Sequence, residues 1–332
     1  MKLRDLLGLK SKNIKTSQYI DYYDTLVFLK NYASTSINLG DVVAKFESRM
    51  TKKKVSKKQF EADIAEYKNI LKQIKPDDIS VENTPLREYQ LRLLDFSKSI
   101  VDDICDNTDI CPFMVAGTLL GAIRHKGFIP WDDDVDFGVM RKDYNGLISY
   151  LSKKYMFINT DNWTYNTRDK LLENEISNNE DKIITYKSPQ GVHVIKKCKN
   201  NMLKCDFFAL DCYNKTHNIT TIKNYSKQFI KFMDFNTSYK EMFERQAFEI
   251  NKKQDIVDDS NIINFGIDSY NFILQMPHEN FSKEEIYPLK EVFFENTIFY
   301  APQRPHDFIR KSYANYDQLP PKIILRHTNS LI

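Results

Sequence analysis

The sequence predicts an α+β protein with an N-terminal helical extension. Apolar residues recur at helical spacing through much of the first part of the chain, and from Leu86 to Ile104 they advance 18 residues in five steps. From residue 113 onward, short apolar or alternating runs typical of strands are separated by further stretches of helical spacing. The 332 residues are enough for two domains, or for one large domain with an appendage.

The expected elements beyond residue 85 alternate between helices and strands. Pro85 opens the amphipathic helix, which is followed by a short buried strand that ends at Gly117. The next expectations are a short helix over 118–124, a strand with one polar face over 134–139 and a helix over 144–151. The rest reads as an Asn-rich surface loop at 159–181, strands at 192–198 and 202–210, an aromatic-rich helix at 220–250, and short elements near the end.

The composition is that of a folded protein, with 42% hydrophobic and 13% aromatic residues, which excludes intrinsic disorder. The net charge of +3 gives no support for a nucleic-acid partner, so none is expected. Residues 1–85 carry 16 basic against 11 acidic residues, a net +5, whereas the remainder carries 32 against 34, a net −2.

Residues 1–85 are predicted to form a basic helical accessory region. Apolar residues from Phe60 to Ile74 have helical spacing, and Pro76 ends the run. Arg49 and five lysines lie just before or at the start of this helix, within residues 49–58. These charges fit a solvated helix face, or a peripheral contact with an anionic membrane, where each basic residue contributes about 1 kcal/mol.

The cysteines and the first residues favour an intracellular location. The five cysteines include no C-x-x-C pair, so reduced thiols are expected rather than a zinc ribbon. Residues 1–17 lack the apolar run of a signal peptide, and the most apolar run, 112–123, is shorter than the roughly 20 residues that span a bilayer. We expect a cytoplasmic protein, or one held peripherally at the inner face of the membrane.

Four aspartates lie within five positions, at Asp132, Asp133, Asp134 and Asp136. Residues two apart on a strand share a face, so the carboxylates of Asp134 and Asp136 are expected to project together. They repel each other unless a cation lies between them, and Mg²⁺, or Mn²⁺ in its place, binds such oxygen ligands. A solvated acidic loop is the alternative, but Trp131 and alternating apolar residues flank the cluster.

A third candidate carboxylate, Asp206, is bracketed by apolar residues on another expected strand. A buried aspartate is costly unless it is paired or bound to metal. We therefore predict that Asp206 is either a third metal ligand or the base that activates the acceptor.

Basic and small residues near these aspartates suggest phosphate chemistry. Arg124, His125 and Lys126 precede the acidic cluster and would neutralise developing charge. Gly117 and Thr118, at a strand-to-helix turn, would offer backbone N–H groups to a phosphate. For His125, a surface position in a basic run is an equal alternative.

Two other residues have structural interpretations. Trp131 is expected to pack in support of the aspartate loop, with stacking on a base or sugar as the alternative. His193 is expected to be a strand residue whose polar atoms are satisfied by a neighbour.

The segment Gly117–Val139, GTLLGAIRHKGFIPWDDDVDFGV, closely resembles the signature of the LicD family, which includes bacterial phosphocholine transferases, fukutin and fukutin-related protein. The resemblance runs from about residue 86 to residue 327, and Asp206-Phe207-Phe208-Ala209-Leu210-Asp211 is similar to the second motif of the family. Ala209 stands where the family generally has proline and Ala314 where it generally has glycine, and neither is an expected metal ligand.

The resemblance implies a nucleotidyltransferase-like mixed β-sheet flanked by helices, forming a catalytic domain over residues 86–332. In that fold a Gly-Ser/Thr turn follows the first strand, an Asp-x-Asp motif lies on the second, and a single aspartate lies on a later strand. Gly117-Thr118, then Asp134 with Asp136, then Asp206 fit these places in order. The residues expected to support this site are Trp131, Asp132, Asp133 and Asp211.

The resemblance also implies a reaction, the transfer of a phospho-alcohol such as phosphocholine from a CDP-linked donor to a sugar hydroxyl, with release of CMP. The acceptor would be a cell-surface glycan or its lipid-linked precursor, as in capsule, lipopolysaccharide or teichoic acid synthesis. Mg²⁺ on Asp134 and Asp136 would bridge the donor diphosphate, and Arg124 and Lys126 would stabilise the departing CMP. Two alternatives remain: a nucleotidyltransferase that moves NMP from an NTP, and a non-catalytic interaction protein on the same fold.

Overall fold

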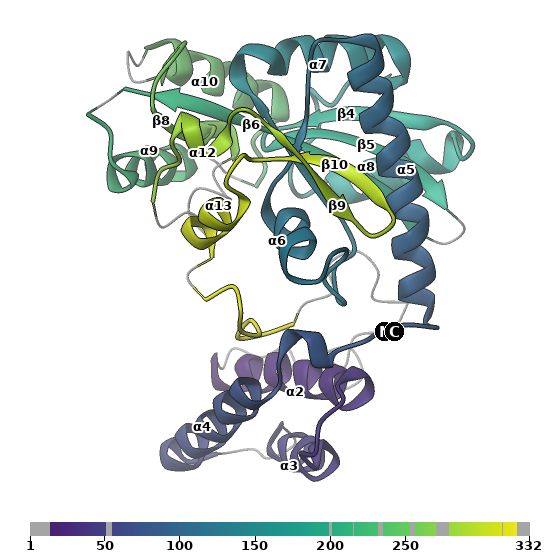
Figure 1. Cartoon of the computed structure of the whole chain (residues 1–332), viewed down its shortest axis with the longest axis vertical. Helices are drawn as coiled ribbons and strands as arrows, with labels where there is room; N and C mark the ends of the chain where they lie inside the picture. The colour runs from purple at the N-terminus through teal and green to yellow at the C-terminus, as the bar shows by residue number, and fades with distance from the viewer. Residues whose placement is uncertain are drawn as a thin grey trace. The chain divides into compact units, whose positions relative to one another are not determined.

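The computed structural model describes residues 14–50, 55–198, 201–214, 216–231, 235–252, 256–269, 279–313 and 315–323. Its contacts divide the chain into two units, Met1–Arg87 with Asn315–Ile332, and Glu88–Ala314 (Figure 1). The sequence pattern put a boundary near residue 85 and kept the C-terminal residues with the larger part. The structure instead groups the described residues 315–323 with the N-terminal helices.

The described part of the smaller unit is helical. It contains α2 (Ile14–Tyr32), α3 (Leu39–Met50), α4 (Lys57–Gln73) and the 3₁₀ turn η1 (Pro76–Asp78). The C-terminal segment joins these helices through hydrogen bonds: Tyr67 Oη donates to the carbonyl of Pro321 at 2.7 Å, and the Ile323 amide donates to Thr25 Oγ1 at 3.0 Å. The two ends of the described chain therefore share one small core.

A buried carboxylate ties the three helices together. Asp63 of α4 is fully buried and accepts hydrogen bonds from Tyr19 Oη of α2 at 2.7 Å and from Gln59 Nε2 at 2.9 Å. Lys45 and Arg49 of α3 lie 3.4 and 3.3 Å from the same carboxylate. Burial acts to raise the pKa of Asp63, but these partners outweigh it and hold the pKa below its usual range.

The basic stretch at 49–58 is described only in part. Arg49 forms an ion pair with the buried Asp63, whereas the Lys57 side chain is 82% exposed. Residues 51–54, which include three of the five lysines, lie outside the described residues. No described helix is both long enough and apolar enough to cross a membrane.

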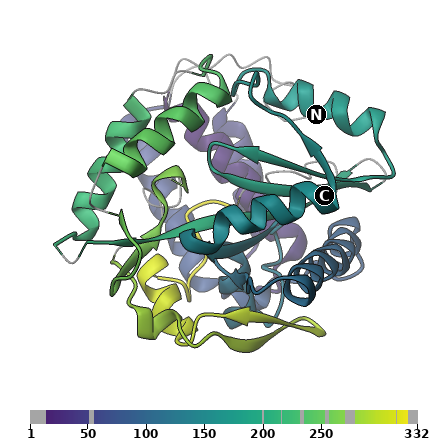
Figure 2. The ribbon, with the colours of Figure 1, turned by 90° about the horizontal axis from the view of Figure 1, so that it is seen from above.

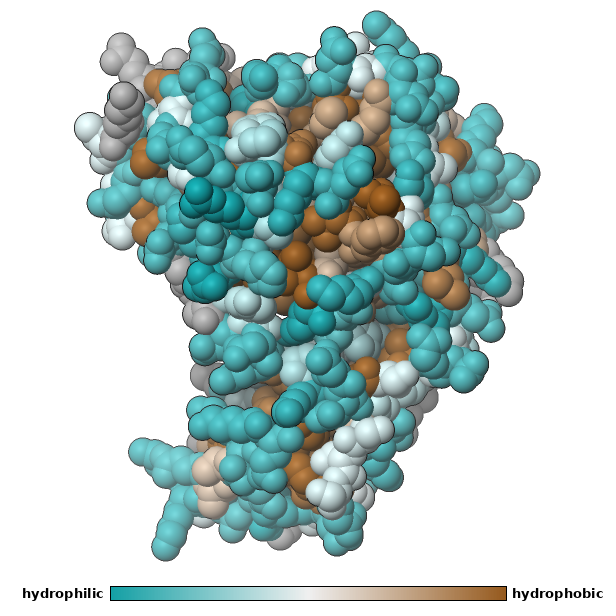
Figure 3. Space-filling view, viewed as in Figure 1, coloured by the Kyte–Doolittle hydropathy of each residue, from teal (hydrophilic) through white to brown (hydrophobic). Residues whose placement is uncertain are grey.

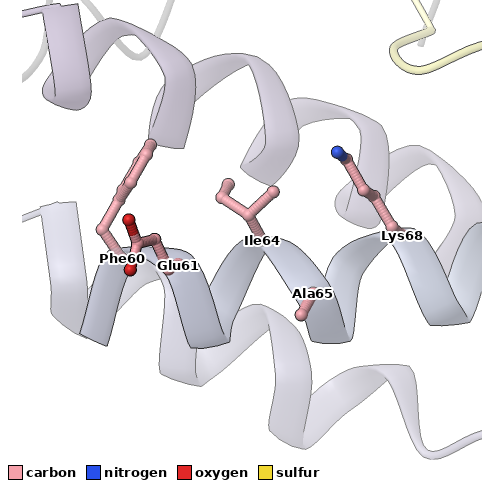
Figure 4. Close-up of a pocket in the computed structure, with 5 residues that line it drawn as sticks. All are labelled: Phe60, Glu61, Ile64, Ala65 and Lys68. Atoms are coloured by element: carbon pink, nitrogen blue, oxygen red, sulfur yellow. The ribbon is translucent and has the colours of Figure 1, made fainter. Parts of the chain in front are cut away.

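A pocket of about 320 Å³ lies along α4 (Figure 4). It is lined by Phe60, Glu61, Ile64, Ala65 and Lys68. Phe60, Ile64 and Lys68 project from the same side of the helix. The lining offers one carboxylate, Glu61, and one amine, Lys68, and the predicted site residues all belong to the other unit, so we assign this pocket no catalytic role.

A mixed sheet of eight strands organises the described part of the larger unit, which confirms the predicted α+β class. Its strands are β1 (Phe113–Met114), β2 (Val135–Met140), β3 (Met156–Ile158), β4 (Ile183–Ser188), β5 (Gly191–Cys198), β6 (Asn201–Tyr213), β7 (Ile256–Val257) and β8 (Ile262–Phe265). The order is β1-β2-β6-β5-β4-β3, with β7 and β8 also paired to β6. Strand β2 runs parallel to β6, and β3 to β4. The long β6 therefore holds β2 and β5 on its two sides.

Helices and a hairpin cover the two faces of this sheet. The hairpin is β9 (Lys290–Phe294) with β10 (Thr297–Ala301). The helical elements are α5 (Pro85–Asn107), α6 (Ala116–Arg124), α7 (Arg141–Lys154), α8 (Arg168–Asn178), α9 (Ile219–Lys231), α10 (Tyr239–Lys252), η2 (Ile267–Ser269), α12 (Lys283–Ile286) and α13 (Pro305–Ser312). Figure 2 shows α10 and the hairpin on opposite sides of the sheet.

Side-chain packing follows the same division. On one face Phe137 of β2 packs against Phe207 of β6 and Phe299 of β10, with ring centroids 5.8 and 5.3 Å apart. On the other face, buried residues of β4 and β5 pack with Leu172 of α8 and Met242 of α10. The sheet is thus buried on both sides, as an α+β domain requires.

Three expected elements differ from the structure. The expected loop at 159–181 contains α8, and β4 was not predicted at all. Helix α8 buries Leu172 as its one fully buried residue, so its sequence carries little apolar periodicity. The expected helical stretch at 220–250 is two helices, α9 and α10. Residues 199 and 200 of the expected turn between β5 and β6 lie outside the described residues.

Exposed hydrophobic surface lies over the β9–β10 hairpin (Figure 3). Phe293 and Ile298 are cross-strand partners there, and they are 65% and 39% exposed. A single exposed apolar pair is ordinary on a protein surface and does not define a binding site.

Candidate active site

Three successive aspartates form an acidic turn that leads into β2. Asp132, Asp133 and Asp134 each offer one carboxylate oxygen, and these oxygens all lie within 4.8 Å of one another. Asp133 is buried, whereas Asp132 and Asp134 are half-buried. The turn therefore concentrates negative charge directly before the first residue of β2.

Helix α5 holds this turn in place through two buried side chains. Gln90 Nε2 donates to the carbonyl oxygen of Asp132 at 2.9 Å. Tyr89 Oη donates toward the carbonyl oxygens of Asp133, at 3.2 Å, and Met202, at 2.8 Å. The amphipathic helix read from the sequence thus does more than pack, because it fixes the backbone of the acidic turn.

The first turn of α6 lies against the same aspartates. A Cβ atom on Gly117 would lie 2.8 Å from Asp132 Oδ2, so a larger residue here would displace the Asp132 carboxylate. Ala116 before it has a φ of 50°, which turns the chain sharply from β1 into α6. Thr118 is buried, and its Oγ1 accepts a hydrogen bond from the Asp136 amide at 2.8 Å. The Gly117-Thr118 turn is therefore next to the aspartates, and its contact with a phosphate stays a prediction.

Asp136 of β2 and Asp206 of β6 are register partners on adjacent parallel strands. They are 8% and 3% exposed, and register partners project to the same face. Burial, followed by the charges of Asp134, Asp206 and Asp132, raises the pKa of Asp136 well above its usual range. The predicted ligands Asp134, Asp136 and Asp206 therefore act on one another, although the tightest described group of oxygens is that of Asp132, Asp133 and Asp134.

Both oxygens of Asp206 are engaged. His193 Nδ1 lies 2.7 Å from Oδ1, and Lys204 Nζ pairs with Oδ2. Burial acts to raise the pKa of Asp206, but Lys204 and His193 outweigh it, so the pKa lies below its usual range. Burial lowers the pKa of His193 in spite of Asp206. The neutral ring therefore donates from Nδ1 to Asp206, and its Nε2 accepts from Ser188 Oγ at 2.7 Å.

Sequence reasoning missed Lys204 as a member of this site. Lys204 and Asp206 are two residues apart on one strand, as Asp134 and Asp136 are, so the alternation that revealed the acidic strand could have revealed this pair as well. The expectation for His193 is confirmed, because it is a strand residue satisfied by neighbours.

Arg124, the last residue of α6, and His125, which follows it, lie against Trp131. Arg124 Nε donates to His125 Nε2 at 2.9 Å, and its guanidinium carbon lies 5.9 Å from the Trp131 ring centroid. Burial, and then Arg124, lowers the pKa of His125 to about 4, so the ring is neutral near pH 7. Lys126 is exposed and has a φ of 61°. Trp131 is 8% exposed, consistent with packing, and the phosphate contacts of the three basic residues stay predictions.

Asp211 belongs to a buried ion cluster further along β6. Arg141 Nε lies 2.7 Å from Asp211 Oδ1, and Arg141 Nη2 lies 2.7 Å from Asp268 Oδ1. Asp211 is fully buried. The cluster links the end of β6, the first residue of α7 and η2, which gives Asp211 contacts that support the fold.

The larger unit is a mixed-sheet domain in which aspartates lie at two adjacent parallel strands, next to a glycine turn. The family model described as the LicD/FKTN/FKRP nucleotidyltransferase domain matches residues 109–304, more than half of the chain. The chain belongs to this family, which confirms the resemblance read from its motifs.

Individual relatives match over shorter stretches. The chain is similar to the lipopolysaccharide cholinephosphotransferase LicD of Haemophilus influenzae, at 44% identity over 66 residues, which are 19% of this chain and 23% of that protein. It is also similar to an uncharacterised protein of Rickettsia prowazekii, at 46% identity over 41 residues, which are 12% of this chain and 15% of that protein. The matched stretches thus cover less than a quarter of these curated relatives.

Proposed function

We propose that this protein transfers a phospho-alcohol from a CDP-linked donor to a hydroxyl of a cell-surface glycan or its lipid-linked precursor, releasing CMP. The observation that carries the proposal is the register pair Asp136 and Asp206, with the acidic turn beside it, in a domain of the LicD family. The similarity to a lipopolysaccharide cholinephosphotransferase supports the choice of a glycan acceptor and a phospho-alcohol.

A divalent cation fits this set of donors. Asp134, Asp136 and Asp206 would hold Mg²⁺, or Mn²⁺ in its place, with Asp132 and Asp133 in support, because Mg²⁺ takes hard oxygen ligands. The lysine ammonium paired with Asp206 supports this fit, since one carboxylate of the set already has a positive charge beside it. When bound, the metal would supply charge neutralisation for the donor diphosphate.

The transfer itself forms one bond and breaks one. The acceptor oxygen bonds to the phosphorus that carries the alcohol, the bond from that phosphorus to the bridging oxygen breaks, and CMP leaves with the electron pair. The acceptor proton passes to a carboxylate. We assign Asp206 to cation binding rather than to this role, because both of its oxygens already accept charge-assisted hydrogen bonds or an ion pair.

Donor binding is assigned to the start and the end of α6. Gly117 and Thr118 would present backbone N–H groups to the diphosphate, since Gly117 adjoins Asp132. Arg124, His125 and Lys126 would contact the phosphates or the nucleotide. The cytoplasmic location, and a peripheral membrane contact through residues 49–58, are part of the same proposal.

Release of CMP from a panel of donors tests the reaction. The full-length protein, with Mg²⁺ and an acceptor extract, should release CMP from at least one of CDP-choline, CDP-ethanolamine, CDP-glycerol and CDP-ribitol. Asp134→Asn should abolish release while its melting temperature stays near or above that of the wild type, because the change removes one of several repelling carboxylates. Asp143→Asn, on the first turn of α7, is the matched control and should retain wild-type turnover.

Two results would replace the proposal by one of its alternatives. Pyrophosphate release from an NTP, without CMP release from any donor, would indicate a nucleotidyltransferase. A folded protein with no metal-dependent nucleotide binding in calorimetry would indicate a non-catalytic interaction protein.

A further inference from the structure

Lys204 lies in a group of charged side chains formed by Asp136 of β2, Asp206 of β6 and Asp134 of the turn before β2. The parallel register pairs Asp136 with Asp206, and it begins one residue earlier, at Val135. Asp134 lies in the acidic turn, one residue before this register begins, and its charge acts on the Lys204 ammonium. Residues two apart on a strand share a face, so Asp136, Lys204 and Asp206 lie on the same face of the sheet.

Lys204 is held in this group by Asp206. Its Nζ pairs with Asp206 Oδ2, and its side chain is only 14% exposed. Burial disfavours the ammonium, but Asp206, Tyr186 and Asp134 outweigh it and raise the pKa of Lys204 above its usual range. A protein-borne cation therefore lies among the carboxylates that the proposed function assigns to the metal.

The other basic residues assigned to the donor make different contacts. Arg124 donates to His125 and lies over Trp131, and the Lys126 ammonium is 3.2 Å from the carbonyl of Ile123. The Lys204 ammonium, by contrast, is directed at the carboxylate of Asp206. A lysine ammonium is a compact charge on a flexible stem, so it can change partners without a change of backbone.

We propose that Lys204 is a tethered cation that holds Asp134, Asp136 and Asp206 together in the metal-free protein, yields Asp206 to the divalent metal, and then binds the diphosphate of the donor. The exchange follows from charge, because a divalent ion attracts the carboxylates more strongly than the ammonium does and repels it. The inference rests on the proposed function. It predicts that Lys204 weakens the binding of the divalent metal and strengthens the binding of the donor.

Calorimetry on the chelator-treated full chain measures both affinities. For Lys204→Met we expect Mn²⁺ alone to bind about tenfold more tightly than to the wild type, since a competing positive charge is gone. With Mn²⁺ saturating, CDP should bind about tenfold more weakly, since a charged hydrogen bond to the diphosphate is lost. A defect of folding alone would weaken both.

Lys196→Met is the matched control. Lys196 lies on β5, level with Leu203 of β6. Leu203 is next to Lys204 in the sequence and projects from the opposite face of the sheet. Lys196→Met therefore removes the same charge from the face that does not carry Lys204. This variant should keep both wild-type affinities. Lys204→Gln, which is neutral but polar, should behave as Lys204→Met does, and Lys204→Arg should stay within a few fold of the wild type.

Each contrary result has a distinct meaning. Mn²⁺ affinity in Lys204→Met and Lys204→Gln equal to or below that of the wild type overturns the competition, and unchanged CDP affinity overturns the donor contact. Either result leaves the proposed function standing. Absence of Mn²⁺ binding by the wild type overturns the proposed metal site and this inference together.

A measurement on the wild type covers the case in which the Lys204 variants do not fold. The rate at which acetic anhydride acetylates Lys204, followed by mass spectrometry, should rise when Mg²⁺ is added and fall again when CDP is added. A rate that does not respond to Mg²⁺ overturns the proposal without any variant.

Discussion

Asp136 on β2 lies directly opposite Asp206 on β6, and both carboxylates are almost completely buried on the same face of the sheet. Two buried like charges raise the free energy of the folded state unless a cation offsets them. Lys204 supplies one positive charge at this point, beside the five aspartates of the candidate site, which are Asp132, Asp133, Asp134, Asp136 and Asp206. A pair of carboxylates that lowers the stability of the folded state is expected where the pair serves the catalysed reaction.

Replacing Asp136 should separate activity from stability. We expect Asp136→Asn to lower the rate of CMP release by about 100-fold or more, the scale of losing a group that organises transition-state charge. The melting temperature of the metal-free variant should equal or exceed that of the wild type, because one repelling carboxylate is gone. A marked fall in melting temperature, as for removal of a stabilising ion pair, would contradict this assignment.

Gln90 should stabilise the acidic turn rather than take part in the chemistry. Its Nε2 approaches the carbonyl oxygens of Ile129, Pro130 and Asp132 at 3.2, 3.4 and 2.9 Å. Gln90→Met keeps the size of the side chain and removes this donor, which should lower the free energy of unfolding by about 1–3 kcal/mol. Turnover should fall as well, because the turn carries Asp132 to Asp134.

Tryptophan fluorescence measures this effect selectively. Both tryptophans, Trp131 and Trp163, belong to the larger unit, so their emission during urea unfolding follows that unit. The control is Gln73→Met, on the exposed last turn of α4, which should leave the fluorescence transition unchanged. An unaltered transition in Gln90→Met would show that the stability of the acidic turn does not depend on the hydrogen bonds of Gln90.

Acid should weaken the smaller unit through Asp63. The folded-state pKa of this carboxyl is below its usual range, so its stabilisation is fully present above the unfolded pKa of about 4 and is lost as the pH falls through the folded pKa. At pH 7, Asp63→Asn should cost about 2 kcal/mol, because hydrogen bonds to a charged group are lost. The difference between variant and wild type should shrink below about pH 4.

Hydrogen exchange of peptides from α2 to α4 reports on this unit at each pH. Glu61→Gln is a suitable control, because Glu61 is 62% exposed and lies 3.7 Å from Lys57 in a surface pair worth less than about 1 kcal/mol. If protection of these helices in Asp63→Asn matched the wild type at pH 7, Asp63 would not be the link between them.

Local patterns were sufficient for most of the elements of the larger unit, though not for α8, β4 or the division of 220–250 into two helices. The helical spacing in α5 and the alternation in β2 are properties of neighbouring residues, so they are legible without the fold. The same holds for the glycine turn before α6 and for the motif that marks the family. Where the apolar periodicity is weak, as in α8 with its single buried leucine, the sequence suggested a loop.

The sequence by itself determined that the chain is an α+β protein of the LicD family with a cluster of aspartates at the start of one strand. Only the tertiary structure decided which partners those aspartates have. Asp136 meets Asp206 across 70 residues of chain, and the C-terminal segment meets α2 and α4. His193 of β5 becomes a partner of Asp206 because strand register is set by the packing of whole strands. Such register leaves no signature in a local pattern, so the charge balance of the site could be read only from the fold.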